Sequence, residues 1–335
     1  MEKLLDIKNL QTSFKTSAGE VHAVRGVSFY LEKGEALGIV GESGCGKSVT
    51  MMSIMRLLDG NGKIVDGEIY FNGRDISNVK EIEMESIRGN DIGMIFQDPM
   101  TSLNPVYTIG NQLMEPLLKH KKISRAEAKR EAIKMLGLVG IPSPEKRMNQ
   151  YPHEFSGGMR QRAMIAMSLI CAPKLIIADE PTTALDVTIQ AQILDLMKEL
   201  KKKFNTSIIL ITHDLGVVAD VCTRINVMYG GTIVETGTSE DIFYRGKHPY
   251  TWGLLRSVPN PKDDAKEKLI PIQGQPPDLL NPPVGCPFAA RCDYAMKICI
   301  QKQPPQFEAG EKHKVACWLC HEDAPKVESP IRRIK

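Results

Sequence analysis

The 335-residue sequence lacks the marks of several large protein classes. No run approaches the roughly 18 apolar residues of a transmembrane helix, and the opening MEKLLDIKNL lacks the apolar core of a signal peptide. Neither sign of charge dominates, because the chain has 43 Lys and Arg residues and 40 Asp and Glu residues. Broad binding to nucleic acid needs a concentrated basic face, so we expect no nucleic-acid partner. We expect a cytosolic protein, unless a partner holds it at a membrane.

Aromatic residues are also scarce, at 6% of the chain. The 42% hydrophobic and 25% charged fractions are nevertheless those of a globular protein and exclude a disordered one. The length predicts two domains, or one large domain with an appendage. No internal repeat is visible.

Cysteine is concentrated near the end of the chain. Five of the eight cysteines lie close together: Cys286, Cys292, Cys299, Cys317 and Cys320. Without an export signal the thiols are expected to be reduced, so the cluster predicts metal binding before disulfides. The spacing matches neither a zinc finger nor a bacterial ferredoxin, and it leaves tetrahedral zinc and an iron–sulfur cluster both open.

Up to about residue 258, short apolar runs alternate with longer helical patterns. Residues 34–40, 174–179 and 206–214 have the length and composition of buried strands. Between the last two runs, one apolar helix face is formed by Ile189, Ile193, Leu196, Met197 and Leu200. This alternation predicts an α/β fold with a largely parallel sheet.

Two segments depart from that alternation. Residues 100–165 are rich in Met and Ala, and Ser124 with Glu127 forms a capping box before a helix through Leu138, which predicts an inserted helical subdomain. Residues 257–283 are rich in proline and predict an extended linker before the cysteines.

Residues 41–48, GESGCGKS, fit the phosphate-loop pattern G-x-x-x-x-G-K-[ST] between a predicted strand and a helix. Glycines let backbone N–H groups surround a phosphate; Lys47 would bridge the β- and γ-phosphates of ATP, and Ser48 would bind Mg²⁺. Cys45 is expected to be a small filler. The alternative, a glycine-rich turn that binds nothing, does not explain the strand and helix around it. The residues expected at the nucleotide are Gly41, Ser43, Gly44, Cys45, Gly46, Lys47, Ser48 and Val49.

Two carboxylates follow the apolar run at 174–179. Asp179 would hold Mg²⁺, and Glu180 would polarise the water that attacks the γ-phosphate. An isolated Asp-Glu pair is more often a solvated strand end, but the phosphate loop favours the catalytic interpretation.

Further motifs identify a family. FSGGMRQR at 155–162 resembles the signature motif of the ATP-binding cassette (ABC) transporter ATPases. Gln97 in IFQDP resembles their Q-loop glutamine, ALD at 184–186 their D-loop, and His213 in ITHD their H-loop histidine. The resemblance covers about residues 1–250. It implies a P-loop ATPase core with a parallel sheet, an antiparallel β subdomain and an inserted helical subdomain.

The resemblance also implies a dimer. Two such domains bind head to tail around two ATP molecules, so that Ser156, Gly157 and Gly158 contact the γ-phosphate held by the partner. Asp186 of the D-loop is also expected at the nucleotide.

Within one chain, the resemblance gives three more residues a role. Gln97 would sense Mg²⁺ and the water and link to a transmembrane subunit, and His213 would hold the γ-phosphate and Glu180 in register. Phe14 would stack on adenine, although an isolated Phe is more often a core residue.

The C-terminal part is similar to the extension of oligopeptide/dipeptide importer ATPases, on the stretches HPYTWGLLRSVP and GCPFAARCDYAMKIC. In that subfamily the extension can carry a [4Fe–4S] cluster, with zinc or free structural thiols as the alternatives here. The ligands expected from the resemblance are Cys286, Cys292, Cys299 and Cys317, with Cys320 spare. We therefore expect an ATPase domain at 1–257 and a linker with a Cys-rich metal-binding extension at 258–335.

The function expected is that of the ATP-hydrolysing subunit of a di- or oligopeptide importer, bound peripherally to the cytoplasmic face of the membrane. Its partners would be a related ATPase in a heterodimer (a homodimer being the alternative), two transmembrane permease subunits and an extracytoplasmic peptide-binding protein. The alternatives are import of nickel or another small solute and, in a different class, a non-transport ABC ATPase. The latter usually carries two cassettes or long coiled coils, which this chain lacks.

Overall fold

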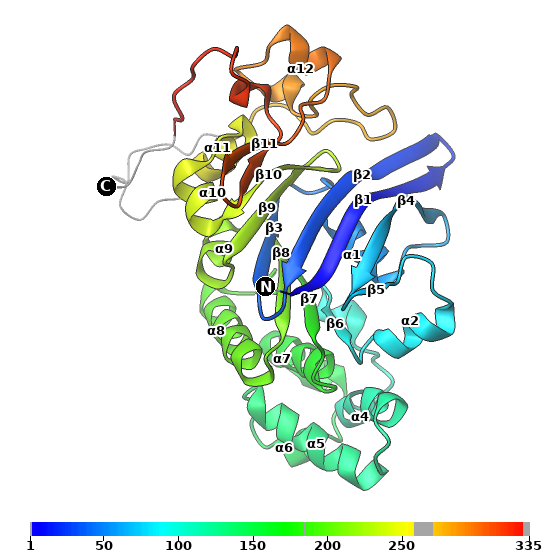
Figure 1. Cartoon of the computed structure of the whole chain (residues 1–335). Helices are drawn as coiled ribbons and strands as arrows, with labels where there is room; N and C mark the ends of the chain where they lie inside the picture. The colour runs from blue at the N-terminus through cyan, green and yellow to red at the C-terminus, as the bar shows by residue number, and fades with distance from the viewer. Residues whose placement is uncertain (1, 184, 258–270, 331–335) are drawn as a thin grey trace. The chain divides into compact units, whose positions relative to one another are not determined.

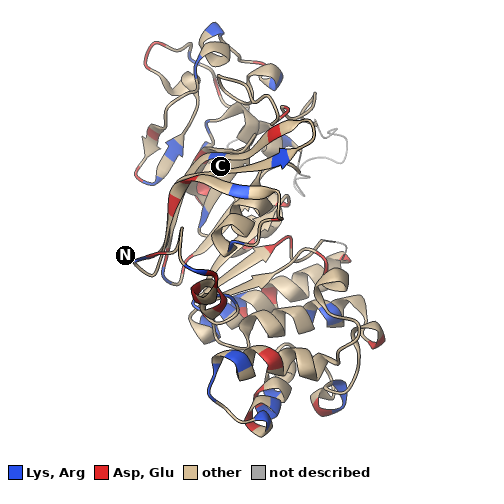
Figure 2. Cartoon of the chain, turned by 90° about the vertical axis from the view of Figure 1, so that its right-hand side faces the viewer, with Lys and Arg blue, Asp and Glu red and all other residues tan. Residues whose placement is uncertain are grey.

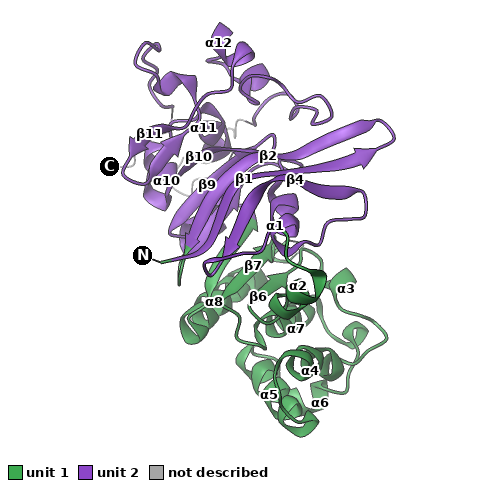
Figure 3. Ribbon diagram, turned by 45° about the vertical axis from the view of Figure 1, so that its right-hand side comes forward, with its two compact units in different colours: residues 1–2, 32–35, 78–211 green, residues 3–31, 36–77, 212–335 purple. Residues whose placement is uncertain are grey.

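The computed structural model describes residues 2–183, 185–257 and 271–330. The chain divides into two compact units (Figure 3). Unit 1 comprises residues 1–2, 32–35 and 78–211, and unit 2 comprises residues 3–31, 36–77 and 212–335. Within the described ranges, no helix is both long enough and apolar enough to cross a lipid bilayer. In the view of Figure 2, basic and acidic residues are interspersed along the chain.

Unit 1 is built on parallel strands and helices. Its strands β6 (Ile92–Ile95), β7 (Leu175–Asp179) and β8 (Ser207–Thr212) lie in the order β8-β7-β6. The strands β7 and β8 are buried throughout, as their apolar sequences predict. The helices are α2 (Glu81–Ile87), α3 (Pro99–Ser102), α4 (Ile109–His120), α5 (Arg125–Leu138), α6 (Pro144–Arg147), η1 (Pro152–Glu154), α7 (Gly157–Leu169) and α8 (Val187–Phe204).

The helical predictions for unit 1 are confirmed in detail. Helix α5 begins at the capping box: Ser124 accepts the Glu127 N–H, and the Glu127 carboxylate accepts the Ser124 N–H at 2.8 Å. Helix α8 buries most of the predicted apolar face, namely Ile193, Leu196, Met197 and Leu200. Helices α3 to α7 fill the segment predicted as a helical insert (Figure 1).

Unit 2 holds two sheets. The first has the order β2-β1-β4-β5, from β1 (Lys3–Thr16), β2 (Gly19–Glu32), β4 (Gly62–Phe71) and β5 (Arg74–Asp75), and β4 is antiparallel to β1 and β5. The second has the order β11-β12-β10-β9-β3, from β3 (Ala36–Val40), β9 (Arg224–Tyr229), β10 (Thr232–Thr238), β11 (Phe307–Gly310) and β12 (His313–Val315). The helices are α1 (Lys47–Met55), α9 (Leu215–Val221), α10 (Ser239–Arg245) and α11 (Pro249–Arg256).

The expectation of a largely parallel sheet needs correction here, because the second sheet is mixed. Strand β3 is parallel to β9, but β10 is antiparallel to both β9 and β12. The cause is a hairpin turn at Gly230–Gly231, where both residues have positive φ values and let β10 return beside β9.

The C-terminal extension joins this sheet. Beyond β11 and β12 it contains η2 (Ala289–Arg291), α12 (Lys297–Gln301) and η3 (Trp318–Cys320). Strand β12 pairs with β10, and the buried His313 and Glu235 side chains of these strands are 2.7 Å apart. Residues 271–283 form no helix or strand, as their prolines predict, whereas the rest of the predicted linker, 258–270, lies outside the described residues.

Candidate nucleotide site

The phosphate loop, residues 41–48, connects β3 to α1 in unit 2. Its glycines lie against backbone: a Cβ on Gly46 would stand 2.5 Å from the Ala23 carbonyl oxygen, and one on Gly41 would stand 2.3 Å from the Met228 carbonyl oxygen. Gly46 also has a φ of +98°. The loop therefore needs glycine at these positions to pack as it does.

Lys47 is buried at the base of the loop. Its Nζ donates to the carbonyl oxygens of Gly41 at 2.8 Å and Glu42 at 3.0 Å. Ser43, Gly44 and Ser48 are exposed, and Val49 is half-buried. The loop thus presents a positive charge, the N-terminus of α1 and a hydroxyl group together, which is a cradle for an anion.

Cys45 lies inside the loop but is buried. Burial raises the pKa of its thiol, against a smaller opposing effect of Lys47. A protonated, enclosed thiol is a poor nucleophile, in keeping with a space-filling role.

Phe14 lies on β1 opposite Gly62 of β4. A Cβ on Gly62 would stand 2.6 Å from the Phe14 ring, so the glycine leaves the space that the ring occupies. The ring is half-buried and keeps some surface for stacking.

In unit 1, Glu180 directly follows β7. Its φ is +47°, which is unusual outside glycine, and its N–H donates to the Ile211 carbonyl at 2.9 Å. Its carboxylate Oε2 accepts hydrogen bonds from Gln97 Nε2 at 3.1 Å and from Thr183 Oγ1 at 3.0 Å. The structure therefore brings Glu180 and Gln97 together, an arrangement that the expected action of both on one water molecule would need. Asp179 is buried at the end of the same strand.

The remaining predicted site residues lie at exposed ends of elements. Ser156 caps α7 by accepting the Met159 N–H at 3.4 Å, and Gly157 and Gly158 form the first turn of that helix. Asp186 caps α8, accepting the Ile189 N–H at 3.0 Å, while Ala184 of the same motif lies outside the described residues. His213, in unit 2, is exposed directly after β8.

Sequence reasoning missed three residues with contacts at these positions. Thr183 holds the Glu180 carboxylate, and Tyr250 and Arg291 hold Glu42 of the phosphate loop. Thr183 could have been found from its spacing of three residues after Glu180. No local pattern marks Arg291, which is 249 positions from Glu42.

The five C-terminal cysteines are free thiols, of which Cys286, Cys299 and Cys317 are buried. Burial, with a smaller contribution from neighbouring thiols, raises the pKa values of Cys286 and Cys292 to about 11. In the described part of the chain, no three His, Cys, Asp or Glu side chains are arranged to hold a metal ion. The predicted [4Fe–4S] or zinc site is thus not confirmed.

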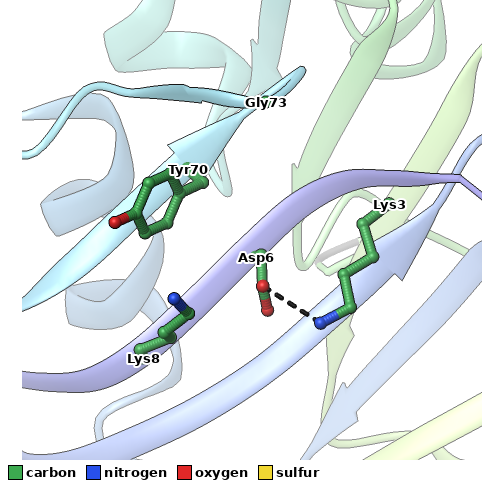
Figure 4. Close-up of a pocket in the computed structure, with 5 residues that line it drawn as sticks. All are labelled: Lys3, Asp6, Lys8, Tyr70 and Gly73. Carbon is green, nitrogen blue, oxygen red and sulfur yellow. Dashed lines mark hydrogen bonds and ion pairs between the residues drawn. The ribbon is translucent and has the colours of Figure 1, made fainter.

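One small surface pocket lies elsewhere in unit 2, lined by Lys3, Asp6, Lys8, Tyr70 and Gly73 (Figure 4). Lys3 pairs with Asp6 at 3.0 Å, and the Lys8 ammonium lies over the Tyr70 ring, 4.6 Å from its centroid. None of its residues belongs to the phosphate loop.

Comparison with known proteins supports one family. Residues 24–183 match the ABC transporter family, and residues 234–299 match the C-terminal region of oligopeptide/dipeptide transporters. The oligopeptide transport ATP-binding protein OppD of Bacillus subtilis is 61% identical over 98% of this chain and 92% of its own length. The dipeptide transport ATP-binding protein DppD of the same organism is 59% identical over 95% of each chain.

Solved structures agree on the fold. The dimeric ATP-binding cassette MJ0796, in a post-hydrolysis state bound to ADP and Pi, is 28% identical with a TM-score of 0.64, over 70% of this chain and 98% of its own. The structure of cbiO1 from Clostridium perfringens is 27% identical with a TM-score of 0.62, over 72% of this chain and 91% of its own. The chain therefore belongs to the ABC transporter ATPases, which hydrolyse ATP, and within them to the group with the oligopeptide/dipeptide transporter C-terminal region.

Proposed function

We propose that this chain is the ATP-hydrolysing subunit that powers import of di- or oligopeptides through an ABC transporter. The observation that carries the proposal is the hydrogen bond between Gln97 and Glu180 in a chain that also has an intact phosphate loop. The cargo is inferred from the extended likeness to peptide transport ATPases and from the C-terminal region.

The phosphate loop is proposed to hold MgATP. Lys47 would leave its two carbonyl partners for the β- and γ-phosphate oxygens, while backbone N–H groups of the loop, from Ser43 to Val49, would surround the phosphates. Ser48 and Asp179 would bind Mg²⁺ together with Gln97. Phe14 would stack on adenine.

For hydrolysis, Glu180 is proposed as the group that accepts a proton from the attacking water. Gln97 and Thr183 already fix the direction of its carboxylate. His213, exposed after β8, would contact the γ-phosphate. The reaction converts ATP and water to ADP and phosphate.

The active assembly is proposed to be a head-to-tail dimer. The exposed N-terminus of α7, with Ser156, Gly157 and Gly158, and the exposed Asp186 suit contact with a nucleotide bound by the partner. The partner is a related ATPase in a heterodimer, with a homodimer as the alternative. Sedimentation of the purified Glu180→Gln chain with MgATP distinguishes the heterodimer from the homodimer. A stable dimer of this chain alone would overturn the requirement for a different partner.

The assembly is completed by two permease subunits and an extracytoplasmic peptide-binding protein. Residues 1–257 form the ATPase domain, with a helical subdomain at about 100–165 that docks on the permease, and residues 258–335 form the extension. The chain would thus be peripheral at the cytoplasmic face of the membrane.

Uptake in cells lacking this chain tests the proposal. Wild-type chain should restore entry of labelled di- and oligopeptides, and Glu180→Gln should not. Restored uptake of nickel without restored peptide uptake would overturn the assigned cargo, whereas restoration by Glu180→Gln would overturn the role of ATP hydrolysis.

We also propose that four thiols of the extension hold a [4Fe–4S] cluster. Cys286, Cys292 and Cys317 influence one another electrostatically, and each sulfur accepts a backbone N–H, as does Cys299 from Met296 at 3.4 Å. This donor set fits thiolate ligation in kind. A bound cluster would cross-link the extension and stabilise it.

Iron, sulfide and zinc analysis of anaerobically purified protein tests this assignment. We expect about four iron atoms per chain, lost in Cys286→Ser and Cys292→Ser and kept in Cys320→Ser, the matched control. Colourless protein with stoichiometric zinc would replace the cluster by the zinc alternative.

A further inference from the structure

The C-terminal extension contacts the phosphate loop through one ion pair. Arg291, at the end of η2, donates from Nη1 to Glu42 Oε2 at 2.5 Å and from Nη2 to Oε1 at 3.1 Å. Only 4% of the Arg291 side chain is exposed. Glu42 is the second residue of the phosphate loop, so a carboxylate of the nucleotide cradle is bound in a bidentate manner by an arginine from the extension.

Other contacts fix the arginine in place. Its Nε and Nη2 donate to the carbonyl oxygens of Gln273 and Ile272 at 2.8 and 3.1 Å, and its Nη1 donates to the Tyr229 hydroxyl at 3.1 Å. Its guanidinium lies 5.9 Å from the centroid of Phe288. A guanidinium held by this many partners has a fixed position, so its ion pair with Glu42 restrains the phosphate loop.

The backbone of Glu42 is held by the same region. Its N–H donates to the hydroxyl oxygen of Tyr250 at 2.8 Å, and Tyr250 is fully buried. The Phe288 ring packs against Tyr229 and Tyr250 with centroids 5.2 and 5.3 Å away. Both the side chain and the backbone of Glu42 are therefore fixed from the C-terminal side.

We propose that Arg291 is a positioning residue for nucleotide binding, which neutralises Glu42 and holds the phosphate loop in its anion-binding form. A carboxylate next to the site of a triphosphate repels the ligand unless it is paired. The segment between Cys286 and Cys292, which carries Phe288 and Arg291, thus sets ATP affinity in addition to joining the fold. The inference rests on ATP binding by the loop and does not depend on the cargo or the metal.

A purely structural ion pair and this role predict different patterns. If the pair only docks the extension, then loss of Arg291 and loss of Glu42 should weaken ATP binding equally. The double variant should then bind ATP no better than either single variant. If Arg291 neutralises Glu42, then Arg291→Gln weakens ATP binding, and adding Glu42→Gln restores it because the unpaired carboxylate is gone. Arg291→Lys keeps the charge but not the bidentate contact, so its ATP affinity should lie between those of wild type and Arg291→Gln.

The test is equilibrium binding of a fluorescent ATP analogue with Mg²⁺ to the full chain. Arg291→Gln should raise Kd about tenfold, or about 1.4 kcal/mol, and the Glu42→Gln/Arg291→Gln double variant and Arg291→Lys should each stay within about threefold of wild type. Lys314→Gln is the control, since Lys314 pairs with Glu308 at 2.9 Å on the exposed surface of the same extension.

Three results would overturn the inference. They are wild-type affinity in Arg291→Gln, a double variant as weak as Arg291→Gln, and an equal loss in Lys314→Gln. If the wild-type chain itself bound no ATP, the proposed function would fail instead. Thermal unfolding of each variant identifies any that has merely lost its fold. Glu42→Gln alone then still carries the comparison, since docking predicts weaker ATP binding for it and neutralisation does not.

Discussion

The phosphate loop of unit 2 is enclosed by its surroundings, whereas the start of α7 in unit 1 is open. Gly41 and Gly46 lie against carbonyl oxygens of other segments, and Lys47 is buried. A Cβ on Gly157 would meet no other atom within 4 Å, and Ser156 is exposed. Both segments present the N-terminus of a helix, but only the first is enclosed by other segments of its own unit.

This difference teaches what each segment is built to do. An enclosed loop with a fixed backbone needs little reorganisation beyond the Lys47 side chain to bind an anion, which favours binding by one chain alone. In the proposed dimer, the exposed start of α7 would offer its N–H groups to a nucleotide held by the partner. Glu180 is intermediate, because hydrogen bonds orient it within unit 1 while its side chain stays partly exposed.

The largest expected effect concerns Glu180. Glu180→Gln should lower kcat for ATP hydrolysis by about 10³-fold, since a general base contributes roughly 10²–10⁴-fold. ATP binding should persist, because the phosphate loop is unchanged. Phosphate release and nucleotide binding are measured together, with the exposed Glu199→Gln on α8 as the control. Turnover near the wild-type rate would remove Glu180 from its role.

The next effect is on the enclosed loop. Lys47→Ala removes the ammonium group that donates to Gly41 and Glu42 and that would meet the phosphates. ATP affinity should fall by about 100-fold, the loss of charge-assisted hydrogen bonds worth about 1.5–3 kcal/mol. Equilibrium binding checks the expectation, and a Kd within threefold of wild type would contradict it.

A pair of glycine substitutions compares the two segments directly. Gly46→Ala should destabilise the protein by about 1–3 kcal/mol, because its Cβ would overlap the Ala23 carbonyl. Gly157→Ala should be neutral or stabilise by up to about 1 kcal/mol, since it adds a better helix former in open space. Denaturant unfolding measures both. Equal effects would show that the loop is no more tightly enclosed than the start of α7.

The residues predicted from sequence are those encoded by short-range patterns. The loop at 41–48, the carboxylates at 179 and 180 and the capping box at Ser124 each occupy a few consecutive positions with a fixed chemical purpose. Such local patterns can be recognised from a few consecutive residues, without knowledge of the long-range contacts of the fold.

What sequence reasoning missed depends on long-range contacts. The pairing of β10 with β12 and the ion pair of Glu42 with Arg291 join residues far apart in the chain. The antiparallel pairing of β9 and β10 could have been expected from Gly230–Gly231 between two β-rich runs. The pairing of β10 with β12 could not, because β12 has only three residues and no distinctive pattern.

The smallest expected effect is on the pH dependence of stability, and it concerns His248, which contacts Tyr250. His248 is buried at the start of α11, where its Nδ1 accepts the Tyr250 N–H at 3.0 Å, and burial lowers its pKa to about 4. The folded state therefore keeps His248 neutral while the unfolded chain takes up a proton below about pH 6.5. The stability that this supplies is present above pH 6.5 and is lost as the pH falls toward 4.

Between pH 7.5 and 5.5 this loss amounts to about 1 kcal/mol. His248→Asn keeps a side-chain acceptor for the helix cap but cannot be protonated, so its unfolding free energy should fall less over the same range, by about that amount. Denaturant unfolding at both pH values gives the difference.

Because His248 supports Tyr250, and Tyr250 holds Glu42, acid should loosen the phosphate loop before it affects the start of α7. Hydrogen exchange that changes equally in both segments on acidification would contradict this, since it would mean that the two are stabilised by the same groups.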